Sequence, residues 1–452
     1  MSESGSSFTR SRAVRVASGI ASFGMVAGVA LVAASPASAA PVCDATFDAS
    51  IDDESDIQGA LGTSTGTVCL IGTFDITTGL TFNYDLTLYG LSDAALAGNG
   101  LVPLLSDATL SNTLAVENMA FTGGFSTSTS GAISGRTVIV INSTFTGNQG
   151  FFGGAIGAQS VEVVGSTFED NVGFVGGAIA GYDFSSPGSR QPSATVTVTA
   201  STFTDNTGQG GGAIYSYGVA NAYSSTFETN VSEEFGGAVV AEYGVYVENS
   251  TFVSNASEEA GGGALTSGYG GTVVQSTFLD NTSNRGGQSI ASYSQQTLIL
   301  LGNIFAGAGA ALHLEAEDAT ISDEGGNLFT TPAEPDLSDL TPSTRFGLTT
   351  LALFNGATLA DNGGATRTVA LYAGSPAINA VPAGSLSTDQ RGTVRPAVSD
   401  AGAYEFVAVL AVTGSAAPSS LLGGAVALLL AGGVLALGLA RRLRPRARTR
   451  TS

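Results

Sequence analysis

The stretch Ser201-Thr202-Phe203-Thr204-Asp205-Asn206, followed by Gly211-Gly212-Ala213, contains the two elements that decide the fold. The first element, Ser-Thr-Phe-x-x-Asn, occurs six times, with steps of 23 to 26 residues and one longer step of 35. Its phenylalanines are Phe145, Phe168, Phe203, Phe227, Phe252 and Phe278, and its asparagines are Asn148, Asn171, Asn206, Asn230, Asn255 and Asn281. The second element, Gly-Gly-Ala, follows the Asn in five of these copies. Self-similarity at such a spacing is typical of a solenoid.

This spacing is too short for two packed helices, and its glycines and β-branched residues disfavour helix. It suits three short strands and three turns, which together make one coil of a parallel β-helix. We therefore predict an all-β fold, a right-handed parallel β-helix (a pectate-lyase-like solenoid) of about ten coils. The alternative is a β-sandwich or another all-β fold, which the regular spacing disfavours.

The alternation of side chains along a strand predicts the role of each repeated residue. Ser and Phe of Ser-Thr-Phe share the inner face, and Thr points outward. Stacked coils then form an interior ladder of Phe and a second ladder of Asn that satisfies backbone groups in the turns. We expect Gly-Gly to supply a turn with positive φ, and the small Ala to pack where coils crowd together.

The two repeated elements resemble the FxxN and GGAI repeats of the chlamydial polymorphic outer-membrane proteins. These are autotransporter adhesins with β-helical passenger domains. The resemblance covers about residues 115 to 310 and implies the coil, but not the export route, because this sequence has no C-terminal membrane β-barrel.

The N-terminal 39 residues have the three parts of a secretory signal peptide. Arg10, Arg12 and Arg15 form a positive region, an apolar run follows, and Ala37-Ser38-Ala39 forms a cleavage site. The alternative is an uncleaved membrane anchor. Because the chain is exported and has an even number of cysteines, we expect Cys43 and Cys69 to form a disulfide. Residues 56–61 are predicted to form a short amphipathic cap over the open end of the β-helix.

The C-terminal end has three parts in order: Leu410-Ala411-Val412-Thr413-Gly414, the 20 uncharged residues 421–440, and a tail with six arginines. A helix of that length spans a bilayer, and the basic tail would stay on the cytoplasmic side. This order resembles a Gram-positive cell-wall sorting signal, in the LAxTG variant of actinobacterial class E sortases. The resemblance implies that sortase cleaves after Thr413 and joins it to a cell-wall amine. The alternative is an unprocessed single-pass membrane anchor.

The segment from about Gly325 to Phe406 has a different composition from the repeats. It resembles the bacterial choice-of-anchor Q domain, which ends surface β-helices just before their anchoring signals. The matching residues are Asn362 to Thr366, Gly374 to Ile378, Asp389 to Gly392, Arg395, and Asp400 to Glu405. We expect the Arg and Asp residues of this segment to form a structural network rather than a catalytic group.

The predicted organisation has seven segments along the chain. They are the signal peptide (1–39), an N-terminal cap with the first coils (40–114), the β-helix repeats (115–324), the choice-of-anchor Q-like module (325–406), the sorting motif with its spacer (407–420), a transmembrane helix (421–440) and a basic cytoplasmic tail (441–452).

The composition limits the partners. Between the two terminal signals there are 36 acidic residues against 7 arginines, and the chain has no lysine. Nucleic-acid binding through a basic face is therefore excluded. We expect no cofactor, although the acidic body could attract calcium. The expected partners are sortase, the cell wall, the membrane before processing, and a glycan or a ligand on a host or cell surface.

Acidic residues also recur at fixed places after the repeated Phe. Glu234 and Glu259 fall at the same position of neighbouring coils, and Arg285 falls at that position in the next coil. This predicts that Glu234, Glu259 and Arg285 form a row along the solenoid. We interpret this row as solvated residues in the turns, and the alternative is a cation site or an acid pair. The predicted function is a non-enzymatic adhesin or structural protein on the cell surface. The alternative is a surface polysaccharide lyase or glycosidase, which would need paired carboxylates.

Overall fold

The computed structural model describes residues 41–408, except 64–65, 184–192, 294–295, 317–318, 335–336, 338–340 and 383–385. The described residues up to Phe406 belong to one compact unit. The predicted signal peptide and the C-terminal segment beyond residue 408 lie outside the described residues.

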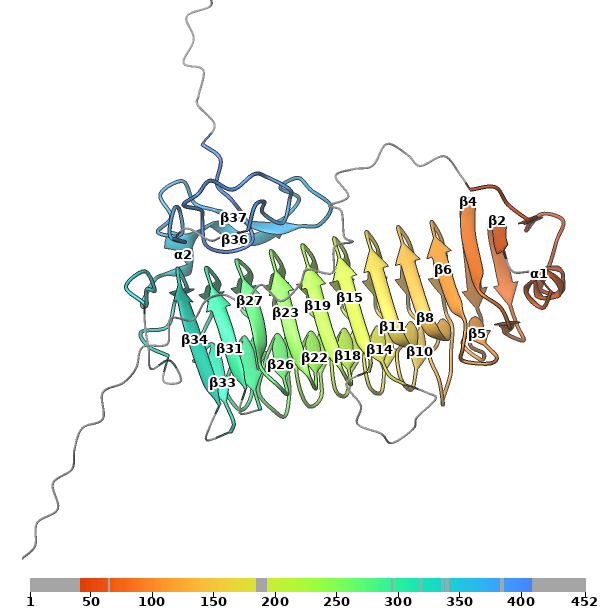
Figure 1. The fold of residues 1–452 in the computed structure, drawn as a ribbon, viewed down its shortest axis with the longest axis horizontal. Helices are drawn as coiled ribbons and strands as arrows, with labels where there is room; N and C mark the ends of the chain where they lie inside the picture. Colours follow the sequence, from red (N-terminus) through yellow and green to blue (C-terminus); the bar gives the residue numbers. More distant parts are fainter. Residues whose placement is uncertain are drawn as a thin grey trace, which may run out of the picture. The chain divides into compact units, whose positions relative to one another are not determined.

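The compact unit is built around a parallel β-solenoid of about 11 turns (Figure 1). This confirms the predicted all-β fold and its repeats of the right-handed β-helix type. Most of the strands form one 29-stranded sheet, and six short strands form a second sheet. The solenoid is slightly longer than predicted, because β34 (Thr320–Gly325) and β35 (Leu328–Phe329) extend the ladders at its C-terminal end.

One turn illustrates the design of the repeat. It contains β18 (Ile214–Ser216), β19 (Val219–Tyr223), β20 (Thr226–Glu228) and the short β21 (Val231–Ser232). Each strand pairs in parallel with the corresponding strand of the next turn, for example Phe227 of β20 with Phe252. Consecutive turns are therefore in register, and a residue at one position of the repeat lies beside its equivalent in the next copy.

The strands fall into four columns, each with one member in most turns. The strands that precede the repeated Phe are β1 (Ala45–Asp48), β2 (Gly66–Ile76), β4 (Leu86–Gly98), β6 (Thr113–Glu117), β8 (Ile133–Ile141), β11 (Ile156–Val164), β15 (Thr195–Thr199), β19, β23 (Gly244–Glu248), β27 (Gly271–Val274), β31 (Thr297–Leu301) and β34. The strands centred on the Phe position are β7 (Ala120–Thr122), β9 (Thr144–Thr146), β12 (Thr167–Glu169), β16 (Thr202–Thr204), β20, β24 (Thr251–Val253), β28 (Thr277–Leu279), β32 (Ile304–Ala306) and β35. The second sheet contains β10 (Gln149–Gly150), β13 (Val172–Gly173), β17 (Thr207–Gly208), β21, β25 (Ala256–Ser257) and β29 (Thr282–Ser283). The strands after Gly-Gly-Ala and their equivalents are β3 (Leu80–Phe82), β5 (Leu105–Asp107), β14 (Ile179–Gly181), β18, β22 (Val239–Ala241), β26 (Leu265–Ser267), β30 (Ile290–Ser292) and β33 (Leu312–Leu314), and β8 and β11 begin in this column.

The repeated phenylalanines form a continuous interior stack. From Phe121 to Phe329, neighbouring ring centroids are 4.7 to 5.0 Å apart and no ring is more than 2% exposed. Burial of each Phe contributes about 1.5–3 kcal/mol to folding. The stack is therefore a main source of the apolar stabilisation of the solenoid.

The Gly-Gly pairs have a different role from the expected one. The pairs at 153–154, 176–177 and 211–212 do not have positive φ, so the expectation of a left-handed turn is wrong for these copies. Instead the backbones of neighbouring turns approach too closely for a side chain. A Cβ on Gly177 would lie 1.8 Å from the carbonyl oxygen of Gly212. The left-handed residues precede the repeated Ser and Asn, as Ala200 (φ 50°) and Asp205 (φ 54°) do.

At both ends of the solenoid, side chains form hydrogen bonds with the backbone groups of the outermost strands. At the N-terminal end, α1 (Glu54–Leu61) places Gln58 beside β3, where its amide exchanges hydrogen bonds of 2.8 and 2.9 Å with the backbone of Thr81. At the other end, the carboxylate of Glu334 accepts hydrogen bonds from the backbone N–H groups of Ala311 and Leu312 at 3.0 and 3.1 Å. These contacts replace the missing next strand.

After the last turn, the chain forms a C-terminal module with α2 (Thr350–Leu353) and the antiparallel pair β36 (Phe354–Ala360) and β37 (Thr368–Leu371). The module packs on the solenoid in one apolar cluster. Its own residues in the cluster include Leu353, Phe354 and Val369, and the solenoid residues include Val253, Leu279 and Ile304. The strands β36 and β37 lie over the solenoid, beside β27 and β23 (Figure 1).

Candidate functional site

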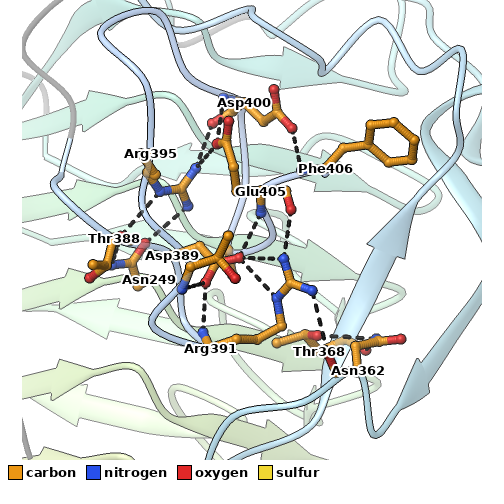
Figure 2. Close-up of polar contacts among 12 residues, drawn as sticks. Asn249, Asn362, Thr368, Thr388, Asp389, Arg391, Arg395, Asp400, Glu405 and Phe406 are labelled. Atoms are coloured by element: carbon orange, nitrogen blue, oxygen red, sulfur yellow. Dashed lines mark hydrogen bonds and ion pairs between the residues drawn. The ribbon is translucent and has the colours of Figure 1, made fainter. Parts of the chain in front are cut away.

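Two arginines and three acidic residues of the C-terminal module form one hydrogen-bonded network around Arg395 (Figure 2). This arginine is completely buried and donates five hydrogen bonds. The acceptors are Thr388 O (3.2 Å), Asp400 O (3.0 Å), Glu405 Oε2 (3.0 Å), Asn249 Oδ1 (3.0 Å) and Gly402 O (2.7 Å). A guanidinium has five N–H groups, so its donors are all used within the protein.

A second arginine, Arg391, extends this network. Its Nε and Nη2 atoms donate to Asp389 Oδ2 at 2.9 and 2.7 Å, and its guanidinium lies 3.6 Å from the centre of the Tyr404 ring. Asp389 is fully buried in this pair and also accepts a hydrogen bond from the backbone N–H of Glu405 at 2.9 Å. The pair therefore fixes the chain just before it leaves the module.

Burial changes the ionisation of the central groups. It lowers the pKa of Arg395 and raises the pKa of both Asp400 and Glu405, because the charged forms lose hydration. The mutual attraction of these groups and the backbone donors to the carboxylates oppose the shifts. Shifted carboxyl pKa values also occur in catalytic sites, but here the groups face one another and backbone atoms. The arrangement is suited to holding the module together.

The network also joins the module to the solenoid, through the left-handed residues of successive turns. Asn249 accepts from Arg395 and donates to Thr388 O at 2.8 Å. In the next turn, Gln275 donates to Ser399 Oγ at 2.9 Å and accepts from Leu386 N at 2.8 Å. In the turn before Asn249, the carbonyl oxygen of Ser224 accepts from the Thr366 hydroxyl at 3.0 Å. The residues directly before the repeated Ser in three successive turns thus form one side of the interface, through their side chains or their backbone.

The outward threonines of Ser-Thr-Phe form the other polar face. Thr251 Oγ1 donates to Gln390 Oε1 at 2.6 Å, and Thr277 Oγ1 accepts from Ala403 N at 3.0 Å. Thr226 Oγ1 donates to Arg367 O at 2.6 Å and accepts from Gln390 Nε2 at 2.9 Å. These three threonines are at most 1% exposed, although the same position is solvent-accessible at Thr144 in an earlier turn.

The sequence carried a signal for this interface that we did not use. The outward residue directly after the repeated Phe is polar in the earlier turns and apolar in the later ones. It is Thr146, Glu169, Thr204 and Glu228 in one group, then Val253, Leu279 and Ala306 in the other. An apolar outward column on a solenoid indicates a covering element. Repeat alignment by position would have revealed it.

The acidic row predicted from the sequence lies on the solenoid, away from this network. Glu234 and Glu259 occupy equivalent places of neighbouring turns, since Ser232 pairs with Ser257. Glu234 Oε1 accepts a hydrogen bond from Gln209 Nε2 at 3.1 Å. Among the described residues, no ion pair joins Arg285 to either glutamate. Glu259 and Arg285 are exposed, and Glu234 is half-buried.

The repeated asparagines are stacked in a buried ladder. Asn206 Nδ2 donates to Asn230 Oδ1 at 2.9 Å and to Phe168 O at 3.0 Å, and the same hydrogen bonds link the neighbouring copies. The ladder runs through Asn148, Asn171, Asn206, Asn230, Asn255 and Asn281. The sequence analysis missed a parallel ladder of the repeated serines, in which Ser201 N donates to Ser225 Oγ at 3.2 Å and Ser225 N to Ser250 Oγ at 3.2 Å.

The remaining predicted sites are placed as follows. Cys43 and Cys69 form a disulfide that ties the start of the described chain to β2. The motif Leu410 to Gly414 and the apolar segment 421–440 lie outside the described residues. Within the described part of the chain, no helix is long and apolar enough to span a membrane, and no cluster of His, Cys, Asp and Glu is suited to hold a metal ion.

Comparison with known proteins adds no family to this description. No protein family matches the chain, and no curated protein is similar to it.

Proposed function

We propose that this chain is a surface-displayed β-helix protein that is anchored to the cell wall and acts as a non-enzymatic adhesin or structural element. In this proposal the signal peptide exports the chain and residues 421–440 hold it in the membrane. Sortase then joins Thr413 to a cell-wall amine. The resemblance to an LAxTG sorting signal supports this order of events, since motif, apolar segment and basic tail follow one another.

The observation that carries the non-enzymatic part of the proposal is the use of polar side chains within the fold. Arg395, whose side chain is buried, directs its hydrogen bonds at protein acceptors. The stacked asparagines and serines likewise bond to neighbouring turns. A catalytic site needs groups that are free to exchange protons or bonds with a substrate. These groups instead build a long, regular scaffold, which suits a spacer or a binding surface.

Anchoring is tested by changing the residue that sortase would join to the wall. We expect Thr413→Ala to release the protein from purified cell walls, because Thr413 is the acyl donor: sortase must cleave the Thr413–Gly414 bond before it can transfer the Thr413 carbonyl to the cell-wall amine. Val412→Ala, at the variable position of the motif, serves as the matched control and should leave attachment unchanged. Equal wall attachment of wild type and Thr413→Ala after detergent extraction would overturn the anchoring proposal.

The adhesive or structural role is tested with the exported chain on a glycan and protein array, together with an assay for glycan depolymerisation. We expect binding or wall reinforcement without cleavage. Depolymerisation of a polysaccharide that disappears in Glu234→Gln or Glu259→Gln would instead establish the alternative of a surface lyase or glycosidase. An exposed carboxylate elsewhere, in Glu162→Gln, is the matched control for those variants.

A further inference from the structure

The C-terminal module is attached to several turns in the C-terminal half of the solenoid and not to its last turn alone. Its polar partners lie in turns that contain Ser224, Asn249, Gln275 and Gly302. Gly402 N donates to Gly302 O at 2.8 Å, so backbone as well as side-chain contacts are made. The attachment therefore spans four successive turns.

The chain does not pass directly from the last turn of the solenoid to the module. After β35, residues around Glu334 and Phe346 cover the open end of the solenoid, and the Phe346 ring stacks on Phe329 with a centroid distance of 5.0 Å. The chain then returns along the side and forms the module. The terminal cover consequently lies between the solenoid and the module in sequence, and it also contacts the module, since Arg345 Nη1 donates to Pro376 O at 3.4 Å.

The exit of the chain is held by the same network that docks the module. Phe406 N donates to Asp400 Oδ2 at 2.6 Å, and Glu405 Oε2 accepts from Asp400 N at 2.9 Å and from Arg395 at 3.0 Å. Arg395 in turn contacts Asn249 of the solenoid at 3.0 Å. A short path of hydrogen bonds thus connects the last residues of the module to the turn that contains Asn249.

We infer that the module is a mechanical clasp: it distributes tension applied beyond Phe406 over four turns of the solenoid, so that the terminal cover and the last turn do not carry this tension alone. The end of a solenoid is its weakest place, because a terminal turn has a neighbour on one side only. Tension at that end would remove turns one at a time. Tension at the clasp must break contacts to four turns together, which requires a higher force.

The biological role of the clasp rests on the proposed wall anchoring, because anchoring would apply tension to the chain at Thr413. The mechanical claim is tested without a cell wall, by holding the full chain at its two ends in an optical trap. We expect the first event to release the module and terminal cover together, with an extension of about 250 Å for the segment from Thr330 to Phe406. Subsequent turns should then unravel in steps of roughly 80–90 Å.

The decisive comparison uses the outward threonines. The triple variant Thr226→Val, Thr251→Val and Thr277→Val removes the hydroxyl groups that contact the module and keeps the side-chain shape. We expect the lifetime of the docked module at constant force to fall at least tenfold, because buried partners lose their hydrogen bonds. The matched control is Thr144→Val, Thr167→Val and Thr202→Val, at the same position of turns that the module does not contact, and its lifetime should equal that of wild type.

A second variant, Gln390→Ala, removes the acceptor on the module and leaves every turn of the solenoid intact. It should shorten the lifetime in the same direction, with circular dichroism showing an unchanged β-sheet content. The inference is overturned if both the triple variant and Gln390→Ala retain the wild-type lifetime. It is also overturned if wild type first loses single turns while the module stays docked. Either result leaves wall attachment through Thr413 untouched, and a failure of that attachment leaves the trap result standing.

Discussion

Thr251 Oγ1 donates a hydrogen bond of 2.6 Å to Gln390 Oε1, although 139 residues separate them in the chain. Both side chains are buried, at 0% and 4% exposed. Thr251 belongs to a repeat and Gln390 to the C-terminal module, so this contact joins two parts of the molecule with unrelated sequence patterns. The same threonine position faces solvent in turns that have no module above them.

We expect Thr251→Val to destabilise the protein by about 1–3 kcal/mol, because the buried Gln390 carbonyl oxygen loses its donor. Thr167→Val, at the equivalent position of a turn that the module does not cover, should change stability by less than about 0.5 kcal/mol. Urea unfolding at neutral pH measures both. Equal effects of the two variants would contradict the docking role of the threonine.

The asparagine ladder predicts a large effect of a single side chain. Asn206→Ala leaves Asn171 Nδ2 and Phe168 O without their buried partner, and we expect a loss of about 3 kcal/mol in the free energy of unfolding. Asn221→Ala is the matched control, because Asn221 is half-buried and donates one hydrogen bond to Thr197 Oγ1 at 3.0 Å. Thermal unfolding distinguishes them, and a loss below about 1 kcal/mol for Asn206→Ala would be inconsistent with a structural ladder.

The phenylalanine stack predicts a difference between buried and exposed rings. Phe227→Ala removes a ring that is 0% exposed and has neighbours at 4.9 and 4.7 Å, so we expect a loss of about 3–5 kcal/mol. Phe174→Ala removes a ring that is 51% exposed and should cost less than about 1 kcal/mol. Denaturant unfolding measures both losses, as a shift of the midpoint at an unchanged slope of the unfolding free energy against denaturant concentration. Similar losses for both variants would refute the interior stack as a main source of stability.

Asp107 predicts a dependence of stability on pH. Burial opposes ionisation of this carboxylate, but hydrogen bonds from Thr109 and Asn112 outweigh it and lower the pKa of Asp107. A lowered folded-state pKa stabilises the fold above the unfolded value of about 3.9, and this contribution disappears as the pH falls through the folded value. Asp107→Asn should therefore be less stable than wild type at pH 7, and the difference should shrink below about pH 4.

The control for this pH dependence is Thr73→Ala, which changes an exposed, uncharged side chain on β2. Because that side chain does not titrate, the stability of the variant should follow the wild-type pH profile in parallel. A difference in the free energy of unfolding between wild type and Asp107→Asn that stays constant from pH 7 to pH 3 would contradict this prediction. It would show that Asp107 acts through the shape of its side chain and not through its charge.

The repeated parts of this protein can be predicted from the amino-acid sequence alone. Phe, Ser and Asn recur at a constant spacing, and in a parallel coil an equal spacing places equal side chains one above the other. The period therefore predicts the solenoid, its Phe stack and the alignment of the asparagines. The serines recur at the same spacing, so the same logic also predicts that they stack; what the spacing does not show is that each Ser Oγ accepts a hydrogen bond from the backbone N–H of the preceding serine.

The position of the C-terminal module, and the partner that each outward residue of the repeat meets, depend on the tertiary structure. Thr167 and Thr251 both belong to a Ser-Thr-Phe element, yet Thr251 is buried because Gln390 and its neighbours cover it. The pairing of Arg395 with Asn249 likewise joins residues 146 positions apart. Local patterns set which face of a strand a side chain occupies, but whether that face meets water or another segment depends on the return path of the whole chain.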